Sequence, residues 1–458
     1  MGSAESTAGE GDGAGATIAS AIALHQRGQL DAAWAMYLAL LQADQNNVDA
    51  LHFLGVLLHQ QGQSLGAIEL VRRAIALRPD YSDAHNNLGN IYQQIGATLD
   101  AAKAYEKALE LRPGHPDASR NLGIALRKLK RHEEALEVHL RAAEREPGEL
   151  QNYYALANAY KDMGRIEEAL AALRKALAMR PEREGFRRLG QLLYGLRRIE
   201  EAAANYRAWL AVEPDSPVAR HMLAACTSEG VPERAGDAFV AAVFDGFAES
   251  FDDVLIHRLE YRAPALLGEA LMRLAGEPRG ALDIVDAGCG TGLLAQYLRA
   301  YAWHLVGVDL SPKMLAKAQR RGGYDRLTVA ELGLFLRSER EAFDVVASSD
   351  TLVYFGDLRE VLAAAAGALR PGGALLFTLE HETEEAAAPQ GYRLHPHGRY
   401  SHAEPYVRAS LVGAGFGAIE LAKAHLRREG ASYVDGLVVT ARMATDHPMS
   451  FGPNVRLI

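Results

Sequence analysis

Three glycines and two aspartates in the second half of the chain have the types and spacing of a nucleotide-binding site. Gly288, Gly290 and Gly292 follow a run of mostly apolar residues that ends near Asp286. Glycine lets a chain turn sharply and lets a ligand lie against backbone amides at the start of a helix. Asp309 ends the next such run, where a carboxylate can accept hydrogen bonds from both hydroxyls of a ribose. These residues predict a site for a ligand that contains a nucleoside.

The residue at position 293 distinguishes this glycine turn from the fingerprint of dinucleotide-binding proteins. The dinucleotide fingerprint Gly-x-Gly-x-x-Gly would place its third glycine where Leu293 stands. NAD is therefore only the second choice of ligand. We expect the turn to lead into a helix that runs from Leu293 to Ala300.

Short β-rich runs alternate with helical stretches after Gly280. The runs that we expect to form strands are Leu282–Ala287, His304–Asp309, Leu327–Ala330, Phe343–Ser348 and Ala374–Glu380. This alternation predicts a parallel sheet that helices cover on both faces. Two later runs, residues 418–421 and 437–441, lack a long helix between them, so they favour an antiparallel pair at the sheet edge.

The first half of the chain is a repeat. Prolines stand at positions 79, 113, 147, 181 and 214, so successive prolines lie 33 or 34 residues apart. Gly62 and Gly96 keep the same period, and so do alanines at 67, 101, 135, 169 and 202. Each copy predicts two short amphipathic helices with a turn between them and a proline after the second. Six copies fill roughly residues 17 to 216, and Ser216 to Cys226 indicates a capping half-repeat.

Phase, length and residue type in all six copies resemble the tetratricopeptide repeat (TPR). Lys130 and Arg197 depart from the pattern by replacing the turn glycine. The resemblance implies a superhelix with a concave face. Five asparagines fall on first helices, at positions that tend to face this concavity: Asn86, Asn87, Asn90, Asn121 and Asn158. Asparagine amides can hold a peptide backbone, so we expect a protein or peptide partner in this groove, with a scaffold for assembly as the alternative.

The motifs from about residue 240 to 442 resemble the class I S-adenosylmethionine-dependent methyltransferases. Beside the glycine turn and Asp309, they include residues 343–354 and the segment Leu369 to Gly373. The order of the two halves is similar to that of a group of bacterial TPR methyltransferases. The resemblance implies an α plus α/β fold class: an N-terminal TPR α-solenoid, then a Rossmann-like, seven-stranded methyltransferase domain whose last strand is antiparallel.

The same resemblance assigns S-adenosylmethionine as the cofactor and implies roles for individual residues. The turn from Gly288 to Gly292 would contact the methionine part, Asp286 would order the loop, and Asp309 would hold the ribose. Glu331 and Leu332 stand where the family contacts adenine. The residues that we expect at the cofactor are Asp286, Gly288, Gly290, Gly292, Asp309, Leu310, Glu331, Leu332 and Ser349, with Phe251 as part of a lid.

Methyl transfer from a sulfonium is an in-line displacement, so positioning supplies most of the catalysis and a dedicated base is optional. Tyr354, His381 and His402 are the candidate catalytic residues, and Glu380 also lies near a strand end. Each has a plain alternative as a pocket wall, a polar residue at a strand end or a residue at a helix start. His395 and His397 lack a third ligand in register, so we predict no metal site.

The absence of two sequence features narrows the range of possible methyl acceptors. No Pro-Pro-aromatic element occupies residues 350 to 354, which makes planar amides and base amines poor guesses. The only cysteines, Cys226 and Cys289, precede the fourth predicted strand, so neither is placed to attack a pyrimidine ring. Cytosine C5 methylation is disfavoured.

Composition excludes further classes of protein. The chain has 458 residues, of which 49% are hydrophobic and 23% charged, and its net charge is −9. A negative net charge is the wrong sign for affinity based on phosphate contacts, so we expect no nucleic-acid partner. No apolar run reaches the length of a membrane span, and the first basic residue is Arg27, so we expect a cytoplasmic protein without a signal peptide.

We therefore expect five segments: a disordered tail over 1–16, the TPR array over 17–228, a helical linker and cofactor lid over 229–280, the methyltransferase domain over 281–445, and a C-terminal tail over 446–458. Three interpretations stay open. The chain is a protein methyltransferase whose repeats select the substrate, a small-molecule methyltransferase whose repeats assemble a complex, or a scaffold that binds the cofactor without turnover. Helical-repeat grooves suit polypeptides, which favours the first.

Overall fold

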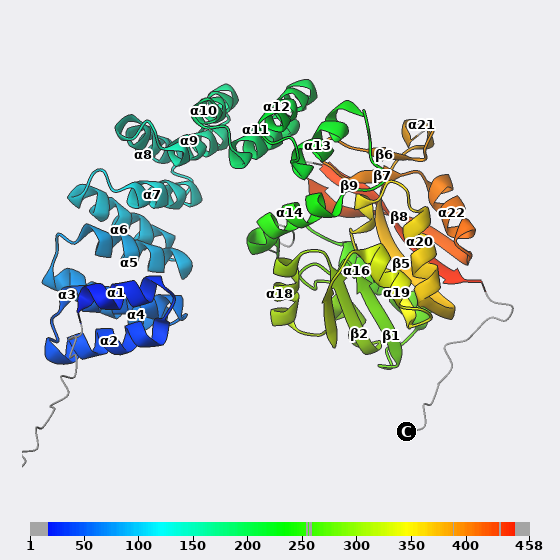
Figure 1. Ribbon diagram of the computed structural model, residues 1–458, viewed down its shortest axis with the longest axis horizontal. Coiled ribbons are helices and arrows are strands. Elements are labelled where there is room, and N and C mark those ends of the chain that lie inside the picture. The colour runs from blue at the N-terminus through cyan, green and yellow to red at the C-terminus, as the bar shows by residue number, and fades with distance from the viewer. Residues whose placement is uncertain (1–16, 253–254, 256–258, 388, 430–431, 445–458) are drawn as a thin grey trace, which may run out of the picture. The chain divides into compact units, whose positions relative to one another are not determined.

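The computed structural model describes residues 17–252, 255, 259–387, 389–429 and 432–444. The chain forms two compact units, Met1–Leu189 and Gly190–Ile458. The boundary lies inside helix α11, Arg183–Gly195, so the second unit contains the end of the sixth repeat as well as the sheet. Figure 1 shows paired helices up to α13, followed by a sheet with helices on both sides. The predicted ranges of the five segments stay predictions. The two predicted tails, residues 1–16 and 446–458, lie outside the described residues.

The described helices confirm the repeat. Helices of 13 and 14 residues alternate from α3 onward, which matches the 34-residue period of the prolines. The helices of the array are α1 Ile18–Gln26, α2 Leu30–Ala43, α3 Val48–Gln60, α4 Ser64–Leu77, α5 Ser82–Gln94, α6 Thr98–Leu111, α7 Pro116–Lys128, α8 His132–Arg145, α9 Leu150–Asp162, α10 Ile166–Met179, α11, α12 Ile199–Val212 and the half-repeat α13 Pro217–Thr227.

Small residues let the two helices of a repeat approach each other. A Cβ atom added at Gly89 would lie 2.4 Å from the ring of Tyr105 on the next helix. The turn between the helices needs a left-handed residue, and Gly96 supplies it with φ +81°. Lys130 and Arg197 adopt the same conformation, with φ +62° and +58°, at a cost of roughly 1–2 kcal/mol each. The period therefore survives both substitutions.

The sheet contains the seven strands that the sequence predicts and two more. The path β3-β2-β1-β4-β5 is parallel, β9 pairs antiparallel with β5, and β8 pairs antiparallel with β9. These seven strands are β1 Leu282–Ala287, β2 Ala302–Asp309, β3 Arg326–Val329, β4 Phe343–Ser348, β5 Leu369–His381, β8 Phe416–Glu429 and β9 Ser432–Met443. The added strands are β6 Tyr392–Leu394 and β7 Tyr400–His402, a hairpin that pairs with the end of β5.

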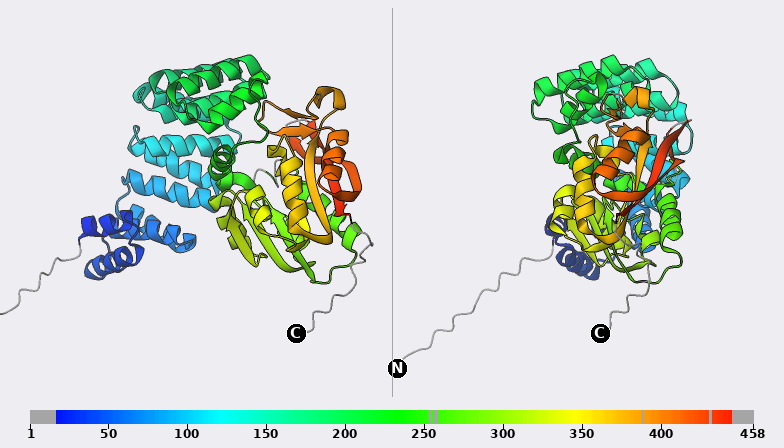
Figure 2. Two further views of the ribbon diagram at one scale, coloured as in Figure 1. Left: turned by 45° about the vertical axis from the view of Figure 1, so that its right-hand side comes forward. Right: turned by 90° about the vertical axis from the view of Figure 1, so that its right-hand side faces the viewer.

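Helices cover both faces of the sheet, as the sequence predicts. Ile284 belongs to the core under α16 and α17, whereas its neighbour Val285 belongs to the core under α19, α20 and α22. The remaining helices are α14 Asp237–Phe247, α16 Ala263–Ala275, α17 Ala295–Leu298, α18 Pro312–Arg321, α19 Leu332–Ser338, α20 Arg359–Ala368, α21 Glu384–Ala387, α22 Glu404–Gly413, and the short 3-10 segments η1 Ala248–Ser250 and η2 Leu352–Tyr354. Figure 2 shows these layers from two further directions.

Two local expectations were wrong. The helix expected over residues 293–300 is the single turn α17, because Leu293 and Leu294 are buried in the turn that precedes it. The strand expected to begin at Ala374 begins at Leu369, which pairs with Phe343, and the register shifts before Ala374 pairs with Val345. Among the described helices, none has both the length and the apolar character needed to cross a bilayer.

Candidate functional site

A cavity of about 250 Å³ lies where the strands β1, β2 and β4 end. It brings together most of the residues that the sequence predicts for the cofactor. The predicted residues that line it are Gly288, Gly290, Asp309, Leu310, Glu331, Leu332, Ser349, Phe251 and Tyr354. Asp286, Gly292, His381 and His402 lie outside its lining. The structure therefore brings most of the predicted residues to one cavity, and that this cavity holds the cofactor stays a prediction.

The three glycines of the turn have different reasons to be glycine. All have positive φ: +80° at Gly288, +53° at Gly290 and +84° at Gly292. A Cβ atom at Gly288 would lie 2.1 Å from Thr351 Oγ1, and one at Gly292 would lie 3.0 Å from the ring of Tyr324. A Cβ atom at Gly290 would meet nothing within 4 Å. Gly290 is therefore the glycine whose missing side chain leaves room for a ligand.

The amides of this turn are engaged within the protein. The amides of Gly288 and Cys289 both donate to the carbonyl of Val308, at 2.8 and 2.9 Å. The amide of Gly292 donates to the carbonyl of Cys289 at 2.9 Å. These three amides are therefore satisfied within the protein, and the helix that follows the turn is one turn long. That a ligand lies against the amides of this turn stays a prediction. The turn offers the ligand the open face of Gly290.

Asp309 ties the turn to the end of β2. Its Oδ2 accepts the amide of Gly290 at 2.9 Å, and its Oδ1 accepts the amide of Ser311 at 2.8 Å. Burial raises the pKa of this carboxyl, and the backbone hydrogen bonds counteract part of that rise. Each carboxylate oxygen has a second lone pair, so Asp309 can still accept two hydroxyls. The role in holding the glycine turn was not predicted.

Asp286 is buried beneath the turn with one oxygen unpaired. Its Oδ2 accepts the hydroxyl of Tyr324 at 2.6 Å, while Oδ1 has no hydrogen-bond partner within the described part of the chain. Burial raises the pKa of this carboxyl to about 7. An orphaned, buried carboxylate oxygen costs stability unless something pairs with it. This fits a cationic ligand group close to the turn.

Glu331 lies at the start of α19 and lines the cavity. Its Oε1 accepts the amide of Gly333 at 2.9 Å, and its Oε2 accepts the amide of Leu334 at 2.7 Å. The carboxylate thus caps a helix, which fixes its position at the rim of the cavity. Contact with an adenine amino group through a remaining lone pair stays a prediction.

Aromatic side chains form one wall of the cavity. Phe251 lies edge-on to Phe244, with ring centroids 6.0 Å apart, and to Phe247, at 5.6 Å. Phe244 lies edge-on to Tyr354 at 5.5 Å. Asp252 fastens this segment, because its two oxygens accept Thr291 Oγ1 at 2.5 Å and Arg321 Nη2 at 2.7 Å. Phe251 thus lines the same cavity as Gly288 and Gly290, and its role in a lid stays a prediction.

Charged side chains gather at the opposite end of the cavity. Asp350, Arg399, Arg427 and Glu429 line this end, and Glu380 lies behind them. Asp350 has φ +52°, which places its carboxylate beside Arg427 Nη1 at 2.8 Å. Burial raises the pKa of Glu380, but Arg399 and Arg427 outweigh burial and hold that pKa well below its usual range. We name these five residues the ionic cluster.

The two histidines proposed as catalytic residues lie elsewhere. His402 is completely buried in β7, and its Nε2 lies 3.0 Å from the carbonyl of Gly356. Burial lowers its pKa to about 4. His381 ends β5 with its Nε2 3.7 Å from Glu404 Oε1. Neither side chain reaches the cavity, because the hairpin β6–β7 continues the sheet beyond β5; of the three candidates, only Tyr354 lines the cavity.

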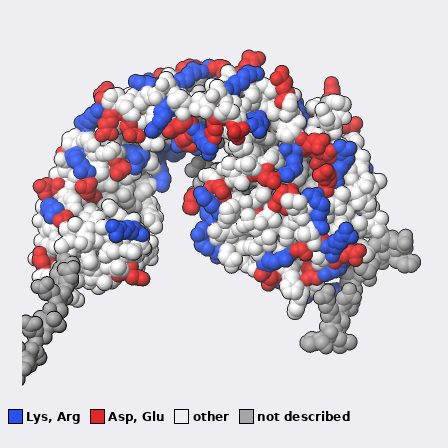
Figure 3. All heavy atoms as spheres, in the orientation of Figure 1, with Lys and Arg blue, Asp and Glu red and all other residues white. Residues whose placement is uncertain are grey.

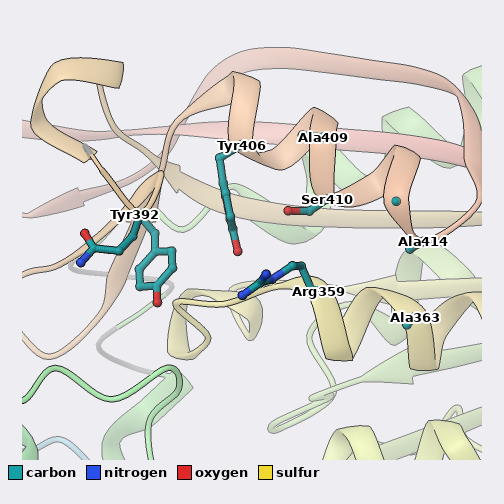
Figure 4. A pocket seen from close by; sticks show the side chains of 9 residues that line it. Arg359, Ala363, Tyr392, Tyr406, Ala409, Ser410 and Ala414 are labelled. Carbon is teal, nitrogen blue, oxygen red and sulfur yellow. The ribbon is translucent and has the colours of Figure 1, made fainter.

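A second pocket of about 470 Å³ lies between α20, α22 and β6 (Figure 4). The Tyr406 ring extends from α22 toward Arg359 of α20 in this view. Arg359 is paired with Asp357, and the Tyr406 hydroxyl accepts the amide of Leu358 at 3.0 Å. The pocket contains none of the residues that the sequence predicts, so we do not regard it as the functional site.

Comparison with known proteins identifies both halves. A family model described as "Methyltransferase domain" matches residues 285–375, which contain the glycine turn, Asp309 and Asp350. Models described as "Tetratricopeptide repeat" and "TPR repeat" match residues 86–149, 154–217 and 57–96. The chain combines tetratricopeptide repeats with a methyltransferase domain.

Curated relatives match between 21% and 30% of the chain. Methyltransferase-like protein 27 of Homo sapiens is 39% identical over 142 residues, 30% of this chain and 55% of that protein. The ubiquinone biosynthesis O-methyltransferase of Hahella chejuensis is 33% identical over 102 residues, 21% of this chain and 42% of that protein. The malonyl-[acyl-carrier protein] O-methyltransferase of Pseudescherichia vulneris is 32% identical over 139 residues, 30% of this chain and 52% of that protein. The chain spans about half the length of these relatives.

Among solved structures, the crystal structure of MamA is similar to this chain. The match spans 35% of this chain and 93% of the MamA chain, with 28% sequence identity and a TM-score of 0.33.

The predicted groove asparagines form a ladder across neighbouring repeats. Asn121 Nδ2 donates to Asn86 Oδ1 at 3.2 Å and to Asn90 Oδ1 at 2.9 Å, and Asn90 also accepts the hydroxyl of Tyr105 at 2.9 Å. Asn87 Nδ2 lies 2.8 Å from His52 Nε2. The structure thus brings four of the five together, with Asn158 one repeat further along on α9.

Sequence reasoning missed Arg399, Arg427 and Glu429 in the cavity lining. They belong to a hairpin and a strand that follow the catalytic motifs by dozens of residues, and no short motif surrounds them. The polar residues near the end of β8 were the available signal, because a buried arginine such as Arg427, which is 3% exposed, needs a charged partner.

Proposed function

We propose that the chain is an S-adenosylmethionine-dependent methyltransferase whose cofactor occupies the cavity at the ends of β1, β2 and β4. The carrying observation is that the matched methyltransferase domain contains a glycine turn in which Gly290 alone has an open Cβ direction, beside a carboxylate free to accept two hydroxyls, Asp309. Leu293 in place of a third glycine argues against a dinucleotide.

The residues around the cavity fit the parts of this cofactor. Asp309 would hold the ribose hydroxyls, and Glu331 with Leu332 would border the adenine. The methionine part would lie against Gly290, and Asp286 would order the turn from beneath, outside the lining of the cavity. Phe251 would cover the cofactor from the side of α14.

When bound, S-adenosylmethionine supplies a methyl group on a sulfonium for in-line displacement. The aromatic wall around Phe251 keeps water from this methyl group. Ser349 shares a hydrogen bond of 2.9 Å with the hydroxyl of Tyr261, which fixes both groups at the end of β4. Tyr354 completes the pocket between the wall and the ionic cluster and would position the acceptor.

Calorimetry on the full-length protein tests the cofactor. We expect S-adenosylhomocysteine to bind with micromolar or tighter affinity and NADH to bind far more weakly. Tighter binding of NADH would overturn the assignment. Transfer of a tritium-labelled methyl group to any component of a lysate that lacks this protein then tests for turnover, and its absence in the presence of cofactor binding would favour the scaffold interpretation.

We propose that the repeats recruit a protein or peptide substrate or partner through the asparagine ladder. The support is that amides on α5, α7 and α9 follow one another along first helices, where an extended peptide can bind to each in turn. The visible face in Figure 3 mixes acidic and basic side chains rather than presenting a single basic region, which favours polar recognition of this kind. The alternative is a small-molecule methyltransferase with the array as assembly scaffold, favoured by relatives named for ubiquinone biosynthesis.

Alanine variants distinguish the two. Replacing Asn87 and Asn158 should lower methylation of lysate proteins and leave the affinity for S-adenosylhomocysteine unchanged. Replacing Asn121 should do the same and also lower the melting temperature, because it removes two hydrogen bonds of the ladder. Label that appears only in the metabolite fraction, at equal rates for all variants, would support the small-molecule alternative.

A further inference from the structure

The ionic cluster at the acceptor end of the cavity carries an unbalanced charge. Arg427 pairs with Asp350 at 2.8 Å, with Glu429 at 3.0 Å and with Glu380. Arg399 pairs with Glu380 at 2.7 Å and with Glu429. Three carboxylates therefore surround two guanidinium groups, and one negative charge is left over.

Burial strengthens the electrostatic effect of this excess negative charge. The side chains of Arg427 and Glu380 are 3% and 6% exposed, and Arg399 and Asp350 are 21% and 18% exposed. Charges so shielded from water interact more strongly than surface charges. His397, beside Glu380, adds no positive charge at neutral pH because burial lowers its pKa to about 3.

The arginines in this cluster are engaged. All three side-chain nitrogens of Arg427 donate to carboxylates of Asp350, Glu380 and Glu429. Arg399 donates through Nε and one terminal nitrogen, which leaves a single terminal nitrogen unused among the described contacts. Glu429 accepts both of its bonds on Oε1, and its side chain is 33% exposed and lines the cavity. Glu429 Oε2 therefore accepts no hydrogen bond among the described contacts, and the excess charge of the ionic cluster is negative.

Resting on the proposed function, we propose that the methyl acceptor is the nitrogen of an amine. The amine gives up its proton to water before it attacks. The N–C bond then forms as the S–C bond breaks, so the positive charge moves from sulfur to nitrogen. That charge arrives beside Asp350 and Glu429, where the surplus negative charge stabilises it.

An oxygen acceptor would meet the opposite electrostatics. A carboxylate or phenolate enters with a negative charge, which the cluster repels, and it loses that charge on methylation. The relatives named ubiquinone biosynthesis O-methyltransferase and malonyl-[acyl-carrier protein] O-methyltransferase act on oxygen by their names. The acceptor atom proposed for this chain therefore differs from theirs.

Chemical stability of the transferred label tests the acceptor atom without knowledge of the acceptor. The full-length protein transfers a tritium-labelled methyl group to components of a lysate that lacks this protein. The products are divided into three portions, of which one is treated with mild base, one with ether-cleaving acid, and one is left untreated. Methyl esters release volatile methanol in mild base, aryl methyl ethers release methyl iodide under ether-cleaving acid, and N-methyl groups survive both. We expect the label to survive both treatments.

Volatile label in either treatment would overturn the inference and leave the proposed function intact. Absence of transfer, with S-adenosylhomocysteine still bound in calorimetry, would overturn the turnover part of the proposed function and this inference with it.

A matched pair of variants tests the role of the charge. Glu429→Gln removes the surplus charge with little change in shape and should reduce transfer about tenfold or more, with cofactor affinity within about twofold of wild type. Glu420→Gln, on the exposed face of the same strand, should behave as wild type. If Glu429→Gln does not fold by circular dichroism, Asp350→Asn replaces it. Wild-type transfer by the folded variant would overturn the inference.

Discussion

Removing the carboxylate of Asp309 is the sharpest test of where the cofactor binds. In the folded protein its two oxygens accept the amides of Gly290 and Ser311 at 2.9 and 2.8 Å. Asp309→Ala therefore deletes the proposed ribose contacts and also releases the glycine turn. A hydrogen bond to a charged group contributes about 1.5–3 kcal/mol. We expect the Kd for S-adenosylhomocysteine to rise by about ten- to hundredfold, with the freed turn moving the value toward the upper end.

The assay is isothermal calorimetry on the full-length protein, with two comparison variants. Asp309→Asn keeps one acceptor oxygen and should fall between wild type and alanine. Asp283→Ala is the control, because Asp283 lies at the other end of β1 and pairs with Arg370 at 2.7 Å and His304 at 3.1 Å. That variant should lose stability but keep its affinity. Binding by a folded Asp309→Ala protein within twofold of wild type would refute the assignment.

Three further predictions follow from the same unit. Gly290→Val should fold, as judged by circular dichroism, yet lose measurable binding of S-adenosylhomocysteine, because its branches would occupy the open space and φ +53° is strained for valine. Asp286, whose pKa burial raises to about 7, keeps a proton in the folded cofactor-free protein that the unfolded chain releases near pH 4, about its unperturbed pKa. Stability should therefore fall as the pH rises from about 4 to about 7, and Asp286→Asn should flatten this part of a urea-midpoint profile. A fragment that begins at Gly190 should be more stable to heat than one that begins at Val231, since the shorter fragment lacks α13.

Periodicity and glycine spacing predicted most of the fold because each reports a local requirement. The 34-residue repeat follows from helices that cross at small residues, and positive φ at the turns explains glycine there. The β-rich runs predicted five parallel strands and an antiparallel pair because buried strands are apolar on both faces. The hairpin β6–β7 has strands of three residues, too short for alternation to be visible, so it was missed.

The candidate site was predictable only where one segment supplies several of its residues. The turn from Gly288 to Gly292 is continuous in sequence, so its pattern could be recognised from the sequence alone. Arg399 and Arg427 are adjacent only because the hairpin pairs with β5 and β8 joins the sheet through β9, and that arrangement depends on long-range packing. His402 failed as a candidate for the same reason, since the strand that contains it turns its side chain into the core.

The half-repeat at the end of the array contacts the hairpin that carries Arg399. His221 of α13 stacks on Phe239 with ring centroids 4.0 Å apart, and its Nε2 donates to the carbonyl of Gly398 at 2.9 Å. The hydroxyl of Tyr400 donates to the carbonyl of Pro232 at 2.6 Å. Gly398 and Tyr400 flank Arg399, so the half-repeat and the segment after it fix the hairpin that carries an arginine into the cavity. This explains why the second compact unit begins inside the sixth repeat. It also means that a change in α13 can reach the acceptor end of the cavity through the hairpin alone, without passing through the cofactor residues of β1 and β2.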